Sequence, residues 1–243
     1  MGLATIPPEL LIAVGEVCSL GTLSSLCRIN WRFHHLLNPL LHKRGVQLAN
    51  TSRSYTTNPA AYAIAHNRPS LVEKFLDFGM DPNTWWDIED VTLYKMPLLC
   101  HSVISGKKDT VIARTLLERG ADVNVEDGRG NTPLLLATRI FLRQVSEPSE
   151  LSESYGSFGP SLNDWAILLL QYGAKVDHMD RHGHTALHMA ASWGLTEVMP
   201  TLLNHGMDVN MLSHMGYTPL YHALVNHQGK AAIYLREMGG TEG

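Results

Sequence analysis

The chain contains a segment that recurs along its length. Residues 58–83 read NPAAYAIAHNRPSLVEKFLDFGMDPN, and residues 185–210 read TALHMAASWGLTEVMPTLLNHGMDVN. Each copy runs from Asn or Thr through an Ala-rich and a Leu-rich stretch to Gly-Met-Asp-x-Asn. Three further copies begin at Met96, Thr132 and Thr218. Because so short a unit cannot bury its own apolar face, the copies are expected to stack into a solenoid.

Each copy predicts two antiparallel helices and a connecting turn. Thr or Asn caps the first helix, and Pro is tolerated in its first turn because the N–H there has no helical partner. Small Ala residues allow close helix approach, and the apolar stripe of the second helix fills the core. A glycine in the left-handed conformation is expected to close each second helix. These glycines are Gly79, Gly120, Gly173, Gly206 and Gly239.

This pattern resembles the ankyrin repeat over roughly residues 51–240. The resemblance implies an all-α solenoid of about five repeats within a domain at 51–243, and Asp or Asn after each closing glycine would order a finger-shaped turn. The second copy has extra residues around SGKKDT. The third has about twenty extra residues within RQVSEPSELSESYGSFGPSLND, which are expected to form a surface loop at about 143–163.

Residues 1–46 do not repeat, and they contain three short amphipathic segments. The patterns IPPELL, LGTLSSLCRIN and RFHHLLNPLL resemble the fungal type of F-box, which binds the Skp-type linker of cullin–RING ubiquitin ligases. Alternatively, this helical segment only caps the end of the solenoid. The resemblance implies a linker-docking face made of Pro7, Pro8, Leu10, Leu11, Leu20, Leu23, Leu26 and Cys27.

Composition excludes several classes of protein. A hydrophobic fraction of 44% and a charged fraction of 17% are typical of a globular chain. The net charge of −4 argues against nucleic-acid binding through bulk positive charge, and no apolar run is long enough to span a membrane. Three widely spaced cysteines form no metal or disulfide motif, which fits the cytoplasm or nucleus.

The stretch RHGHTALHMAASWG, residues 181–194, contains a cluster of histidines. His188 takes the fourth position of the T-P-L-H element, where the resemblance implies a structural histidine bonded to the neighbouring turn. His178, His182 and His184 belong to a finger turn. Their spacing from His188 is reminiscent of a metal site, but alternate turn residues and a buried helical histidine do not converge with zinc geometry. We therefore expect neither metal nor cofactor.

Repeat geometry implies that finger tips and first helices line a binding groove. Trp, Tyr and Arg, which are enriched at binding hot spots, occur at these positions. The first two copies would contribute Tyr55, His66, Lys95 and Ile104, and Trp85 and Trp86 at the first finger tip form a second candidate contact. The main expected binding residues are Arg129, Asn131, Arg139, Arg181, His182, His184, Trp193, His214, Met215, Tyr217 and Asn226.

Three functions fit these features. The first is a substrate adaptor that docks a Skp-type linker and captures an unknown target protein in the groove. The second is a plain ankyrin scaffold. The third is an enzyme or small-molecule binder, in which the insertion closes the groove and His182, His184, His214 and Tyr217 perform an acid–base step, such as a cyclisation or isomerisation, on a small apolar ligand.

Overall fold

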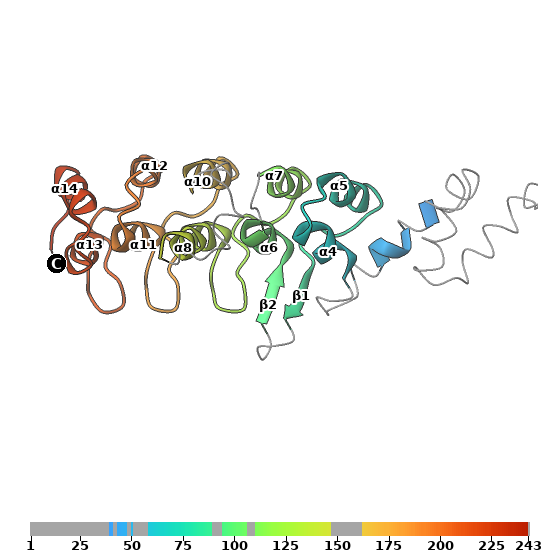
Figure 1. The fold of residues 1–243 in the computed structure, drawn as a ribbon, viewed down its shortest axis with the longest axis horizontal. Coiled ribbons are helices and arrows are strands. Elements are labelled where there is room, and N and C mark those ends of the chain that lie inside the picture. The colour runs from blue at the N-terminus through green and yellow to red at the C-terminus, as the bar shows by residue number, and fades with distance from the viewer. Residues whose placement is uncertain are drawn as a thin grey trace, which may run out of the picture.

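The computed structural model describes residues 58–88, 94–105, 110–146 and 162–242, together with 39, 40, 43–47 and 50. Within this part of the chain the helices form two stacked rows with finger loops below the inner row (Figure 1). The inner row contains α4 (Pro59–Ala65), α6 (Leu98–Ser105), α8 (Pro133–Ser146), α11 (Ala186–Trp193) and α13 (Pro219–Val225). The outer row contains α5 (Pro69–Asp77), α7 (Val111–Glu118), α10 (Leu162–Gln171), α12 (Met199–Asn204) and α14 (Gly229–Glu237). The predicted all-α ankyrin solenoid is confirmed.

Side-chain caps begin the inner helices as expected. The buried Asn58 accepts hydrogen bonds from the Ala60 and Ala61 amides, at 2.9 and 3.2 Å. Thr185 and Thr218 cap α11 and α13 in the same way. Each cap satisfies amides that have no partner within the helix, so these residues mark where each repeat begins.

The closing glycines all take the left-handed conformation. Their φ angles lie between 86° and 91°, a region that residues with a Cβ rarely adopt. This confirms the prediction made for Gly79, Gly120, Gly173, Gly206 and Gly239.

The core lies between the two rows of helices. Leu116, Leu169 and Leu202 of the outer row are completely buried, as are Ala190 and Ala223 of the inner row. Small residues let neighbouring inner helices pack directly, α4 on α6, α6 on α8, α8 on α11, and α11 on α13. Each buried leucine contributes about 1.5–3 kcal/mol relative to an exposed one, so most of the stability comes from this packing.

Asparagine side chains connect successive repeats along one edge of the stack. The amide of Asn124 donates to the Gly173 carbonyl at 3.2 Å and accepts from the Lys175 amide at 2.8 Å. Asn83 and Asn210 make the same two bonds to the following repeat, and Asn50 makes them to Gly79 and Asp81. We call this series the asparagine ladder. At the remaining equivalent position the residue is Asp177.

The first finger is longer than the others and forms a hairpin. Strands β1 (Trp85–Ile88) and β2 (Tyr94–Pro97) pair antiparallel, with Trp86 opposite Met96. Trp86 is fully buried, with its ring edge-on to His101 at a centroid distance of 4.9 Å. Of the two candidate contact residues Trp85 and Trp86, Trp86 is therefore not available to a partner, because strand pairing directs it into the core.

The long insertion begins later than expected. Helix α8 continues to Ser146 and α10 starts at Leu162, so residues 143–146 and 162–163 are helical rather than loop. The stretch FLRQVS keeps the helical pattern of α8 beyond the length of the other inner helices. Residues 147–161 lie outside the described part of the chain.

Residues 43–47 and 50 contact the first repeat. Val46 is buried, and a Cβ placed on Gly45 would lie 2.9 Å from Phe75 Cε1. Together with Asn50 of the asparagine ladder, these contacts extend the stack towards the N-terminus. The proposed linker-docking residues all lie outside the described residues, as does Tyr55. Where the structure describes the chain, it contains no helix with the length and apolar character needed to cross a membrane.

Candidate partner-binding surface

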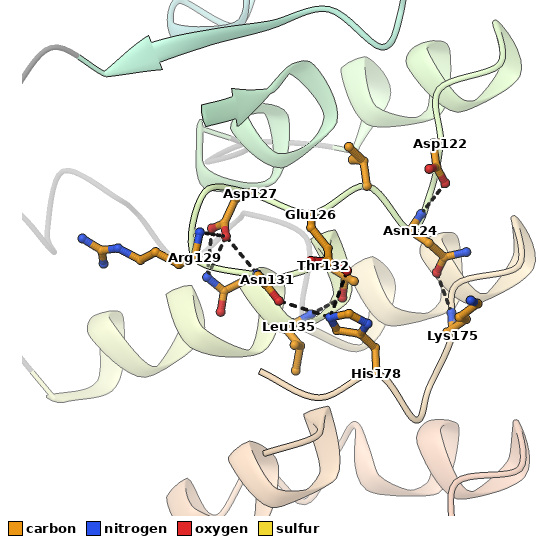
Figure 2. A network of polar contacts seen from close by, with 12 residues as sticks. Asp122, Asn124, Glu126, Asp127, Arg129, Asn131, Thr132, Leu135, Lys175 and His178 are labelled. Atoms are coloured by element: carbon orange, nitrogen blue, oxygen red, sulfur yellow. Dashed lines mark hydrogen bonds and ion pairs between the residues drawn. The ribbon is translucent and has the colours of Figure 1, made fainter. Parts of the chain in front are cut away.

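The finger loops of the third to fifth repeats carry most of the predicted binding residues. These loops, residues 125–131, 178–184 and 211–217, and the adjoining helices α8, α11 and α13 are here called the finger face. Backbone bonds connect neighbouring fingers, such as His214 N–H to the His182 carbonyl at 3.2 Å. The His178 imidazole spans the previous gap by bonding the Gly130 carbonyl at 3.1 Å (Figure 2). Hydrogen bonds between neighbouring fingers therefore hold these loops in fixed positions relative to one another.

A buried carboxylate organises each of the first two of these fingers. Asp127 accepts from the amides of Arg129 and Asn131, both at 2.8 Å (Figure 2). Asp180 does the same for His182 and His184 in the next finger. These carboxylates hold a tight turn, so the residues that follow them have defined directions. In the sequence, such a turn is marked by an Asp three residues before a glycine that takes a positive φ.

His188 is a structural residue, as expected. Its side chain is 1% exposed, and its Nδ1 accepts from the Thr185 amide at 3.2 Å in a capping box. Nε2 therefore carries the proton and donates to the Tyr217 carbonyl of the next finger at 3.1 Å. Burial lowers the pKa of His188 to about 4, so the ring is neutral near neutral pH.

His184 and His222 form a pair of neighbouring imidazoles, of which only His184 was predicted from the sequence. Their ring centroids lie 5.0 Å apart at 89°, and the His188 ring is 5.5 Å from that of His222. Burial lowers the pKa of His184, and His182, His214 and Arg139 lower it further against the opposite effect of Asp180. Burial, and then His184, also lowers the pKa of His222. The missed residue, His222, follows Tyr217 by five positions, and only the stacking of repeats brings it to His184.

Arginines border these histidines on the finger face. Arg139, exposed on α8, donates to Asn131 Oδ1 at 2.9 Å, and Arg181 donates to the Gly128 carbonyl at 2.6 Å. Asn131 itself is 1% exposed, so its amide positions Arg139 and is not part of the outer surface. Arg129 is exposed and extends away from its finger (Figure 2).

Large apolar side chains are exposed beside this charged group. Met215 is 73% exposed, and Trp193 is 44% exposed at the end of α11. Tyr217 stacks on Tyr221, another residue absent from the predicted set, with centroids 4.1 Å apart and rings nearly parallel at 7°. Asn226 follows α13 and bonds its own helix through the His222 carbonyl. The predicted residues thus divide into a cationic part and an apolar part.

The first two repeats contribute less to this surface. His66 stacks on Tyr62, and Lys95 lies over the Trp85 ring at 4.5 Å. Ile104 is 36% exposed at the end of α6. Among the described residues, no group of three or more His, Cys, Asp or Glu is placed to hold a metal ion.

Comparison with known proteins agrees with the fold. Residues 161–242 match the family model for ankyrin repeats in three copies. The chain is 32% identical over 120 residues to the NF-kappa-B inhibitor cactus of Drosophila melanogaster, covering 45% of this chain and 24% of cactus. It is 25% identical over 181 residues to a putative ankyrin repeat protein of fowlpox virus, covering 67% and 90% of the two chains.

A third relative is the E3 ubiquitin-protein ligase KEG of Arabidopsis thaliana. It is 25% identical over 228 residues, which cover 82% of this chain but only 14% of KEG. The chain thus spans a small part of two of these three relatives. Ankyrin repeats with an exposed, partly apolar finger face indicate a protein-interaction module.

Proposed function

We propose that the chain is a substrate adaptor that captures a target protein on the finger face. The observation that carries this proposal is the exposed group of Trp193, Met215 and Tyr217, which lies on fingers and helix ends held by bonds between repeats. Aromatic, Met and Arg side chains are enriched in protein interfaces, and a preorganised surface loses little entropy on binding.

The second part of the proposal concerns residues 1–46. This segment would dock a Skp-type linker through Leu10, Leu23 and neighbouring apolar residues, and so bring the captured target to a cullin–RING ubiquitin ligase in the cytoplasm or nucleus. Its support is the F-box-like sequence pattern. The partial similarity to a plant protein named as a ubiquitin ligase is compatible with this role.

Co-purification from eukaryotic cell lysate tests both parts with the full chain. We expect a Skp-type linker with the wild type and with Trp193→Ala/Met215→Glu, but not with Leu10→Asp/Leu23→Asp. The target protein should co-purify with the wild type and with Leu10→Asp/Leu23→Asp, but not with Trp193→Ala/Met215→Glu. Ile233→Glu is the matched control, because Ile233 is 59% exposed on the outer helix α14. If no linker co-purifies with the wild type, the adaptor role is contradicted and a plain scaffold remains.

The acid–base alternative rests on a different observation. His184 and His222 are half-buried neutral imidazoles near Tyr217, and such groups can transfer protons near neutral pH. His182 and His214 lie at the more exposed finger tips. Native mass spectrometry of the purified full chain tests this function. A small apolar ligand retained by the wild type but lost from His184→Gln would favour it, whereas a wild-type chain free of ligand would count against it.

A further inference from the structure

Exposed charges of both signs lie on the outer side of the described solenoid. Asp77, Glu118 and Glu237 are exposed on the outer helices, and so are Lys74, Arg114 and Arg236. The finger face carries exposed cations, although the whole chain has a net charge of −4. These cations are Arg129, Arg139 and Arg181.

Two of the three carboxylates in the finger loops are buried, and one is exposed. Asp127 and Asp180 are each 5% exposed and accept hydrogen bonds from their own turns. Glu126 is exposed and lies 3.9 Å from the His178 imidazole, on the side away from Arg129 (Figure 2). It lies near the Arg181 side chain, because a Cβ placed on Gly130 would be 3.8 Å from Glu126 Oε2 and 3.9 Å from Arg181 Cγ. A partner that approaches the finger face therefore meets positive charge first.

Arg139 and His184 form the inner part of this cationic region. Arg139 comes from α8, and His184 comes from the finger that leads into the neighbouring helix α11, which packs on α8. One Arg139 nitrogen is held by Asn131, which fixes the guanidinium and leaves its other N–H groups to bind a ligand. A carboxylate between them would receive charge-assisted hydrogen bonds.

The apolar part of the finger face lies one repeat further along. Tyr217 and Tyr221 form a stacked pair, Met215 is largely exposed beside them, and Trp193 and Val225 end the adjacent helices α11 and α13. We infer that the finger face binds an acidic segment of a partner protein, with carboxylates against Arg139, Arg181 and His184 and an apolar side chain against the Tyr217–Tyr221 pair. This inference rests on the proposed function of target capture.

Such binding would take up a proton. A carboxylate beside His184 would raise the pKa of its imidazole, which lies below the ordinary value in the free chain, so affinity should increase as the pH falls. Added salt should weaken binding because the contacts are charged. The titratable and charged groups that face or adjoin His184 are Asp180, His182, His188, His214, His222 and Arg139.

Selection of short random peptides on the full chain tests the inference without a known partner. We expect the selected peptides to be rich in Asp and Glu and to include an aromatic or aliphatic residue. By fluorescence anisotropy, their affinity should fall roughly tenfold or more with Arg139→Gln/Arg181→Gln and recover in part with Arg139→Lys/Arg181→Lys. Arg114→Gln, an exposed arginine of the outer helix α7, is the matched control and should change nothing.

The other outcomes separate the two proposals. Neutral or basic peptides that are lost with Met215→Glu would leave target capture intact and overturn the acidic partner. No enrichment, or binding unaffected by Met215→Glu in a folded variant, would overturn both. A short single-stranded oligonucleotide that binds as tightly as the acidic peptides, with the same dependence on Arg139 and Arg181, would show a general polyanion site and also overturn the inference. Affinity that does not rise between about pH 7.5 and about pH 6 would exclude His184 from the contact.

Discussion

Replacing Asp177 by Asn should stabilise the solenoid. Asp177 stands where the asparagine ladder has Asn in the other repeats, but a carboxylate cannot donate to the Gly206 carbonyl. Asn at this position can donate to Gly206 and accept from the Asp208 amide. The equivalent bonds of Asn124 measure 3.2 and 2.8 Å, so the geometry of the repeat already suits both.

The size of the gain follows from the number and exposure of these bonds. A net contribution of about 0.5–1.5 kcal/mol is typical of one intramolecular hydrogen bond. The bonds of the asparagine ladder are exposed, so the lower end of this range applies to each of them. Two such bonds give about 1 kcal/mol in the free energy of unfolding. For a chain of 243 residues this corresponds to an increase of about 2–4 °C in Tm.

Thermal and denaturant unfolding followed by circular dichroism measure this gain. Asn210→Asp is the matched control, because it removes the donor to Gly239 in the next repeat and should lower stability by about the contribution of one such bond. If Asp177→Asn leaves stability unchanged while Asn210→Asp reduces it, Asp177 is accommodated in some other way and the reasoning fails. If neither variant changes stability, the ladder contributes nothing measurable.

Three further predictions concern the fourth repeat. His188→Ala should lower the free energy of unfolding by about 1–3 kcal/mol, because it leaves the buried Thr185 amide without its acceptor and removes one of the two donors to the Tyr217 carbonyl. His182→Ala, at an exposed position, should change it little in the same melts. Gly183→Ala should destabilise the chain by more than a typical surface substitution, because φ is 78° and the added Cβ would collide with His214. Gly216→Ala is the control in parallel melts, because Gly216 has a φ of 79° but open space around it. The difference between the two variants measures the collision apart from the backbone strain. The free energy of unfolding should fall as the pH drops from about 6.5 to about 4, because burial lowers the pKa of His188 to about 4 and the unfolded chain binds more protons in that range. Urea titrations at several pH values measure this dependence. The prediction is contradicted if the free energy of unfolding has the same pH slope in the wild type and in His188→Gln.

The sequence alone determined the repeat, its helix caps and its closing glycines. These features depend on bonds within one repeat, such as Thr185 to its own helix or the left-handed turn at Gly206, and local chemistry is readable from local pattern. The role of His188 was also predictable, because its position in the T-P-L-H element places it against the next finger. The division of the finger face into charged and apolar residues was only partly predictable.

Only the tertiary structure decided which side chains meet between repeats. Trp86 is buried because the first finger pairs as two strands, and the pairing register of a hairpin depends on a partner strand. His222 reaches His184 because of how successive repeats stack. A periodic sequence specifies each unit well, but the contacts between units depend on the side chains that both neighbours place at the shared surface.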